Sequence, residues 1–96
     1  MSERKSDLVL ENQEDVRNVQ LLKQRLVPLL AKSRKKQLRI DAAAVERVDA
    51  SALQLLVAFA QAVQAHKREI DWHAPSEAFL RAVAGLGLND ALGVAR

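Results

Sequence analysis

The amino-acid sequence predicts an α/β fold with a mostly parallel β-sheet. Three short apolar segments with the alternation of strands are interleaved with three segments of helical periodicity. An order of strand, helix, strand, helix, strand, helix is typical of parallel strands joined by right-handed crossovers. Alanine, leucine and valine supply most of the 49% hydrophobic content, and aromatic residues make up only 3%. Small aliphatic side chains of this kind suit helices packed closely on a sheet.

The N-terminal part of the chain is expected to supply the first strand and the first helix. Residues 1–6 are predicted to be a disordered polar leader, and residues 7–94 a single domain. The segment DLVLEN indicates a strand, and the polar QEDVRN after it indicates a turn with a brief second strand around Val16. A helix is predicted over residues 19–33, with Asn18 as its N-cap. Its apolar face is formed by Val19, Leu22, Leu26 and Leu29.

The middle of the chain is expected to supply a second strand and the longest helix. Pro28 lies inside the first helical segment, where its missing N–H should kink the helix. The segment QLRID, residues 37–41, alternates as a strand does. The connection after it has two apolar anchors, Val45 and Val48, and the strongest helical periodicity then runs over residues 51–66.

The C-terminal part is expected to add a third strand and a third helix. The segment REIDWH, residues 68–73, alternates between apolar and polar side chains. Ser76 is the predicted N-cap of a helix over residues 77–85, and Gly85 is its predicted C-terminal stop. Three leucines of the amphipathic tail at residues 86–96 are expected to close over the core: Leu86, Leu88 and Leu92.

Several kinds of catalytic and ligand-binding chemistry lack their residues in this chain. There is no cysteine, which excludes a disulfide, a thiolate metal site and a cysteine nucleophile. The three glycines match no phosphate-binding loop, and His66 and His73 match no metal-binding spacing. Asp49, Ser51 and His73 supply the residue types of a catalytic triad, but Ser51 lacks the glycine-flanked elbow of a hydrolase nucleophile. We therefore expect a non-enzymatic protein with no cofactor and no metal.

The sequence has no segment that resembles a membrane span or a secretory signal. No apolar stretch reaches the ~18 residues that a span requires, and the N-terminal segment lacks the apolar core of a signal peptide. A chain without cysteine also suits a reducing compartment. We expect a cytoplasmic protein without direct membrane insertion.

Four basic residues lie close together after the first helix, in a chain whose formal net charge is +3: Lys32, Arg34, Lys35 and Lys36. Such a run can contact nucleic acid or anionic lipid, or it can be a solvated helix end whose cations oppose the helix dipole. No aromatic residue interleaves with it to stack on bases. We therefore favour the solvated helix end and expect no nucleic-acid partner, which a salt-dependent binding measurement on DNA and RNA tests.

The helix predicted from Ser51 onward begins with a serine whose position has a structural explanation. Ser51 and Gln54 form an S-x-x-Q capping box, in which each side chain satisfies a free backbone N–H. A phosphoryl group on Ser51 would add about two negative charges beside the positive end of the helix, with little harm to folding. The same group would repel a partner that carries a carboxylate against this site.

The same helix is apolar around about twice the ~100° that a helix covering a sheet requires. Its polar arc holds little besides four residues: Gln54, Gln61, Gln64 and Arg68. Either neighbouring helices cover the surplus, or the surplus is a docking surface for another protein. In so small a domain we favour partial exposure.

Taken with these segments, the sequence resembles the STAS domain family, whose bacterial prototypes are anti-sigma factor antagonists. The resemblance covers about residues 7–94. The family has a strand that ends in aspartate, a valine anchor, an aspartate–serine–serine–glycine–leucine turn before a long helix, and a late leucine–glycine–leucine segment. Those places are occupied here by Leu38 to Asp41, Val45, Asp49 to Leu53, and Leu86 to Leu88.

The resemblance implies a STAS-like fold, in which a small, mostly parallel or mixed sheet of about four strands packs against three to four helices. The serine that is phosphorylated in the antagonists corresponds to Ser51. The first serine of the family turn corresponds to Ala50 and its glycine to Ala52. The partner-binding residues that the resemblance and the helix pattern together predict are Asp49, Ala50, Ser51, Ala52, Leu55 and Phe59.

The function that the resemblance implies is a non-catalytic protein-interaction module in a bacterial partner-switching pathway. Its partner would be a serine-kinase, anti-sigma-like protein that phosphorylates Ser51. The alternative is a constitutive subunit without phosphorylation, in a chemotaxis or signalling assembly or beside the ATPase of a lipid-transport ABC complex.

Overall fold

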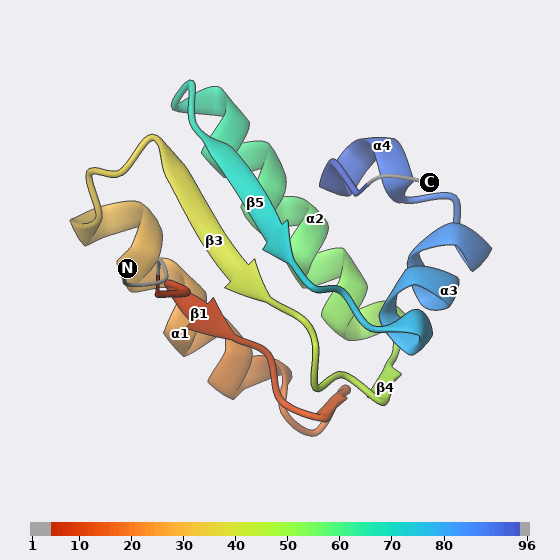
Figure 1. Ribbon diagram of the computed structural model, residues 1–96. Helices are drawn as coiled ribbons and strands as arrows, with labels where there is room; N and C mark the ends of the chain where they lie inside the picture. Colours follow the sequence, from red (N-terminus) through yellow and green to blue (C-terminus); the bar gives the residue numbers. More distant parts are fainter. Residues whose placement is uncertain (1–4, 95–96) are drawn as a thin grey trace.

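The computed structural model describes residues 5–94, which form two small parallel sheets and four helices (Figure 1). The larger sheet has the order β1-β3-β5, with β1 (Leu8–Val9), β3 (Gln37–Asp41) and β5 (Glu69–His73). The smaller sheet pairs β2 (Gln13–Glu14) with β4 (Arg47–Val48). The helices are α1 (Val19–Lys32), α2 (Ala50–Ala65), α3 (Glu77–Gly85) and α4 (Asn89–Leu92). The predicted α/β order and parallel pairing are confirmed, and the described residues hold five strands in place of about four.

One face of the larger sheet packs against the hydrophobic core. β3 pairs in parallel with β1 on one side and with β5 on the other, which sets Ile40 opposite Trp72. Leu38 and Ile40 are fully buried because α1 and α2 lie across the same face of the sheet (Figure 1). The alternate side chains of the strands point to the opposite face. That face carries the ion pair of Arg39 and Asp71, whose Nε and Oδ2 atoms are 3.0 Å apart.

α1 covers the sheet with the face that its leucine spacing predicts, since Leu22 and Leu26 are buried. Asn18 precedes the helix as expected, but its side chain does not cap it. The Asn18 Nδ2 group instead donates a hydrogen bond to the carbonyl oxygen of Gln13, at 2.9 Å. The helix continues through Pro28, which is exposed. The proline therefore interrupts the backbone hydrogen bonding of α1 without ending the helix.

α2 lies at the centre of the helical layer, and its wide apolar surface is covered. α1, α4 and β5 all pack against it. Leu55 and Val57, on the flank of the helix, are partly buried against the core. The large apolar residues that are exposed in the described chain lie elsewhere: Val9, Val16, Leu21, Val27 and Leu86. The expected partial exposure of the apolar flank is therefore found only at partly buried residues such as Leu55 and Val57, because neighbouring elements cover most of the surplus.

α3 begins and ends at the residues predicted from the sequence. Ser76 Oγ accepts a backbone N–H of the first turn at 3.1 Å, which confirms the predicted N-cap. Gly85 still belongs to the helix, and Gly87, with a φ of +68°, makes the turn. The N–H of Leu88 closes this turn on the carbonyl of Val83 at 2.9 Å, as in a Schellman motif. The predicted end at Gly85 is confirmed, although the left-handed conformation that favours glycine falls two residues later, at Gly87.

The tail after α3 closes over the core with two of its three predicted leucines. Leu92 is buried and Leu88 is partly buried. Leu86 is 53% exposed, because it occupies the C-cap of α3 and points away from the core. Residues 1–4 of the predicted leader and residues 95–96 of the predicted tail lie outside the described residues.

Candidate functional site

The N-terminal end of α2 brings together two segments that are distant in sequence. β4 leads directly into the helix, and β2 runs beside β4 with Glu14 opposite Val48. The turn after β2, residues 15–17, is therefore held next to the first residues of α2. Figure 1 shows this end of α2 at β4, at the opposite end of the helix from the point where β5 begins.

Asp49 fixes this arrangement with both oxygens of its carboxylate. Oδ1 accepts the N–H of Ala52 at 3.0 Å, which makes Asp49 the N-cap of α2. Oδ2 accepts the N–H of Val16 at 2.9 Å, which ties the turn after β2 to the helix. The backbone N–H of Asp49 donates to the carbonyl of Glu14 at 3.1 Å. One carboxylate thus joins both segments, and its charge lies at the positive end of the helix dipole.

The predicted capping box of Ser51 and Gln54 is wrong. α2 begins at Ala50, one residue before its predicted start, and Asp49 occupies the N-cap. Aspartate and serine are about equally good N-cap residues, so the backbone decides between them. Asp49 has the extended conformation of a cap, with a ψ of 176°, whereas Ser51 already lies inside the helix. The helix therefore does not need Ser51 in order to begin.

Ser51 is exposed in the first turn of α2, next to the exposed Ala50. Its hydroxyl makes no hydrogen bond to any other residue that the structure describes. The turn held beside the helix exposes Val16 to 62% and the side chain of Arg17 to 73%. We call these four residues, Val16, Arg17, Ala50 and Ser51, the helix-start surface. This surface combines small apolar groups, one hydroxyl and one guanidinium at the positive end of a helix.

The residues predicted for partner binding do not share one surface. Three of them lie together at the helix start: Asp49, Ala50 and Ser51. Ala52 is fully buried and Phe59 is 4% exposed, because residues seven apart lie on the same face of a helix and this face meets the core. Leu55 is partly buried. Ala52 and Phe59 are therefore core residues and offer no side-chain surface to a partner.

Two acidic residues beside the site have pKa values shifted in opposite directions. Burial raises the pKa of Glu14, although the N–H of Glu11 at 2.7 Å and the guanidinium of Arg25 at 3.6 Å both favour the charged form. The Arg17 guanidinium, 3.0 Å from Asp15, holds the pKa of that carboxyl below its usual range. The same ion pair raises the pKa of Arg17. Both members of the Arg17–Asp15 ion pair therefore stay charged at neutral pH, and the exposed Arg17 guanidinium remains paired at the helix-start surface.

Sequence reasoning missed the part of the site that comes from the turn after β2. The segment QEDVRN has the composition of any polar turn, and nothing in it indicates that the N–H of Val16 meets a carboxylate 33 residues later. It also gives no sign that Glu14 is buried. The one local signal is the N-cap preference of Asp49, which competes with that of Ser51 in the same segment.

The described residues contain neither a metal-binding cluster nor a membrane-spanning helix. Within residues 5–94, no group of three histidine or acidic side chains is arranged to hold a metal ion. None of the helices in that range is long and apolar enough to cross a membrane. The Asp49 carboxylate accepts two backbone N–H groups, and His73 is an exposed residue at the end of β5.

Comparison with known proteins places this chain in a family. No curated protein matches the chain. A family model described as "Mlab, STAS domain" matches residues 1–94, which is nearly the whole chain. The parallel strands and the helices around α2 agree with that match. The chain therefore belongs to the STAS domain family.

Proposed function

We propose that this protein is a non-catalytic, cytoplasmic interaction module of a bacterial partner-switching pathway. It docks a serine-kinase-type, anti-sigma-like protein at the helix-start surface, and phosphorylation of Ser51 by that partner controls the contact. STAS domains are generally non-catalytic modules that mediate protein–protein interactions. Membership of this family supports a protein partner, and the geometry of the helix-start surface supports the role of Ser51.

The observation that carries the proposal is an exposed serine that its own helix does not use. Asp49 caps α2, so a phosphate on Ser51 would remove no capping hydrogen bond. The first turn of a helix has backbone N–H groups without helical acceptors, and its dipole favours an anion there by roughly 0.3–1 kcal/mol at an exposed position. Modification at Ser51 is therefore compatible with the folded state.

Phosphorylation would change the charge of the helix-start surface much more than its shape. The surface now exposes the Arg17 guanidinium, whereas a phosphoserine would add about two negative charges beside Asp49. A partner whose carboxylate faces this surface is attracted by Arg17 before modification and repelled after it. Asp49 itself opposes modification by adding like charge, so we expect the kinase to supply a compensating cation.

The direct test incubates the purified protein with a serine-kinase-type, anti-sigma-like protein and ATP, and then maps phosphate by mass spectrometry. We expect phosphate on Ser51 and a loss of affinity for the partner, which Ser51→Asp should reproduce. Ser76 is the matched control, because it also starts a helix but its hydroxyl caps α3 and donates to the carbonyl of Val45 at 2.5 Å. Phosphate at other positions only, or equal affinity of the two forms for the partner, would contradict the switch.

A second candidate function is a constitutive subunit of a signalling or transporter assembly, without a phosphorylation cycle. Ala50 and Ala52 favour it, because they replace the first serine and the glycine of the family turn, and Ala52 is fully buried. This candidate predicts stable co-purification with an ATPase or a signalling complex. Ser51→Asp would then weaken assembly only by its local charge, and Ser51 would stay unmodified while the partner is bound.

A further inference from the structure

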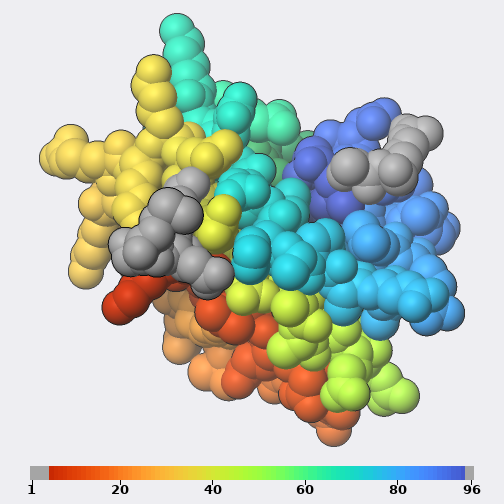
Figure 2. Space-filling model, in the orientation of Figure 1, coloured from red at the N-terminus to blue at the C-terminus, as the bar shows by residue number. Residues whose placement is uncertain are grey.

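A basic pole lies at the end of the molecule opposite the helix-start surface. Two connections meet there, residues 33–36 between α1 and β3 and residues 66–68 between α2 and β5, because β3 and β5 are neighbouring parallel strands. Figure 2 shows these yellow and teal segments projecting side by side from the same end of the molecule. α2 has 16 residues, so its end at the pole lies roughly 24 Å from its start.

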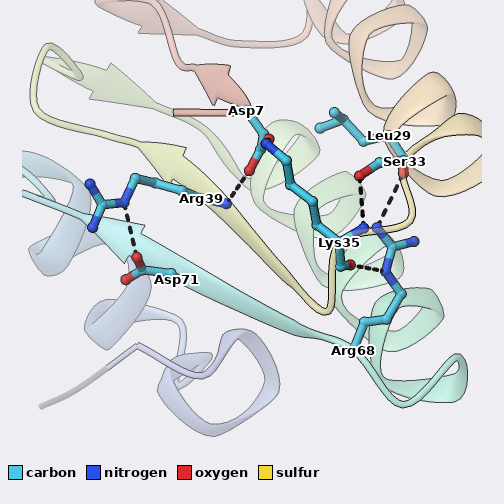
Figure 3. Close-up of polar contacts among 7 residues, drawn as sticks. All are labelled: Asp7, Leu29, Ser33, Lys35, Arg39, Arg68 and Asp71. Atoms are coloured by element: carbon cyan, nitrogen blue, oxygen red, sulfur yellow. Dashed lines mark hydrogen bonds and ion pairs between the residues drawn. The ribbon is translucent and has the colours of Figure 1, made fainter. Parts of the chain in front are cut away.

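The cations of the basic pole outnumber its carboxylates. Its basic residues are Lys32, Arg34, Lys35, Lys36, Lys67 and Arg68, and the acidic residues near them are Asp7 and Glu69. Lys35 is neutralised by Asp7, whose Oδ1 lies 2.6 Å from Nζ (Figure 3). Arg34, Lys36 and Lys67 have no carboxylate partner within residues 5–94. The negative ends of the α1 and α2 dipoles together offset about one further positive charge. The basic pole therefore has an excess of roughly three positive charges.

The pole is held in place by hydrogen bonds and is not a loose run of charges. Arg68 Nε donates to the carbonyl of Lys35 at 2.7 Å, and its Nη2 donates to the carbonyl of Leu29 at 3.5 Å (Figure 3). Ser33 Oγ accepts the N–H of Lys35 at 3.3 Å within the same loop. One guanidinium thus connects the start of β5 to the end of α1, and both basic loops keep a fixed relation to each other.

These loops line a shallow, open hollow of about 530 Å³ whose polar lining is cationic. The polar and charged residues that line it are Ser33, Arg34, Lys36, His66, Lys67 and Arg68, and no carboxylate lies among the lining residues. Lys67 has a φ of +58°, a left-handed conformation that glycine adopts with less strain. Solvated cations at a helix end explain the charge of this region. The turn that ends α2 explains the left-handed backbone of Lys67, but glycine is the usual residue at such a position, and the lysine adds a cation at the rim of the hollow.

We propose that the hollow of the basic pole binds a phosphate-bearing anion with at least two negative charges. Lysine and arginine side chains bind phosphate by charge-assisted hydrogen bonds, and Lys36 and Lys67 bring theirs from two separate loops. The anion is either a free organic phosphate or the head group of a phospholipid, which share this chemistry. The lining contains no phenylalanine, tyrosine or tryptophan, and His66 is its one ring on which a base could stack, so it offers no series of stacking platforms for single-stranded nucleic acid.

The test uses NMR titration of the isotope-labelled protein with inorganic pyrophosphate at constant ionic strength. We expect saturable shifts confined to residues 33–36 and 66–68, and affinity that falls roughly tenfold or more in Lys36→Glu and in Lys67→Glu. Lys23→Glu is the matched control, because it changes the net charge equally at an exposed position of α1 that does not line the hollow. A parallel flotation assay compares phosphatidylcholine vesicles with vesicles that contain about one third cardiolipin, whose head group carries two phosphates.

Each outcome decides the proposal. Pyrophosphate binding that the two pole variants lose and Lys23→Glu keeps supports a free phosphate ligand. Flotation with the anionic vesicles alone, lost in the same two variants, supports a lipid head group. The proposal is overturned if neither probe binds, if Lys23→Glu is as damaging as the pole variants, or if an oligonucleotide binds where pyrophosphate and vesicles do not. None of these results depends on whether Ser51 is phosphorylated.

Discussion

Asp49 and Ser51 both have side chains suited to capping a helix, and the backbone assigns the cap to Asp49. The sequence narrows the start of α2 to two residues and no further, because N-cap preference does not separate aspartate from serine. The deciding contact is the hydrogen bond from the Val16 N–H, which fixes Asp49 in an extended conformation. Because Asp49 caps the helix, the Ser51 hydroxyl is not needed for capping and is available for another role.

The first prediction is that Asp49 contributes to the free energy of unfolding as the cap of α2, whereas Ser51 does not. Asp49→Ala removes the cap of α2 and the tie to Val16, and should lower the free energy of unfolding by about 2 kcal/mol. Ser51→Ala should change it by less than about 0.5 kcal/mol, because an exposed alanine is at least as good a helix former. Urea denaturation of both variants measures the difference.

Asp49→Asn is the control for that measurement, because its amide oxygen can still accept one backbone N–H. It should fall between the other two variants. A loss of stability in Ser51→Ala equal to that in Asp49→Ala would contradict the assignment of the cap.

The second prediction concerns the buried carboxyl of Glu14, whose pKa burial raises above 4.5. Above 4.5 the folded state binds this proton more tightly than the unfolded state, so the free energy of unfolding falls as pH rises through the folded pKa. Glu14→Gln does not titrate. The stability of the parent protein minus that of the variant should therefore decrease from pH 4.5 toward neutral pH.

Denaturation curves of the two proteins over that range provide the measurement. The lowered pKa of Asp15 acts in the opposite direction but only below its ordinary value of 3.8, so it does not enter the window. If the stability of the parent protein minus that of Glu14→Gln stays flat or rises with pH, then folding does not raise the pKa of Glu14, and the prediction is wrong.

Among the secondary-structure elements, those with clear periodicity could be predicted from the sequence, and those made by tertiary contacts could not. β3 and β5 follow from their alternation, and the N-cap of α3 follows from Ser76. The β2–β4 pair has only two residues in each strand, and no pattern of that length is distinctive. The wide apolar surface of α2 is compatible with either a partner or neighbouring helices. The sequence of α2 alone does not predict that α1 and α4 pack on it.

The third prediction concerns the C-terminal end of α2. The N–H of Arg68 bonds the carbonyl of Val63 at 3.0 Å, and Lys67, at a φ of +58°, holds the left-handed position of this turn. Lys67→Gly should raise the free energy of unfolding by roughly 0.5–1 kcal/mol, because glycine relieves the strain at some cost in chain entropy. The same variant should bind pyrophosphate more weakly.

Thermal denaturation and the pyrophosphate titration together check this prediction. Lys67→Ala removes the charge but keeps the backbone strain, so it should lose binding without gaining stability. A glycine variant that is less stable than the parent protein would contradict the strained turn.

In the molecule as a whole, α2 connects two surfaces of different chemistry. Its start presents Ser51 beside Arg17, and its end contributes Lys67 to the cationic hollow. Sites this far apart with no shared contacts are expected to act independently. The fourth prediction is therefore that Ser51→Asp leaves pyrophosphate affinity unchanged, and that Lys36→Glu leaves affinity for the protein partner unchanged. Calorimetric titration of each variant with each ligand measures this, and a reciprocal effect would reveal coupling through α2.

Docking of a protein partner at the helix-start surface is the claim on which the proposed function depends most. Hydrogen–deuterium exchange of the protein, with and without a serine-kinase-type, anti-sigma-like partner, tests this claim most directly. We predict that the partner slows exchange in residues 15–17 and at the start of α2, around Ser51, and that Ser51→Asp abolishes this protection. Protection confined to the exposed side of α1 around Leu21 and Val27, with the start of α2 unchanged, would contradict it.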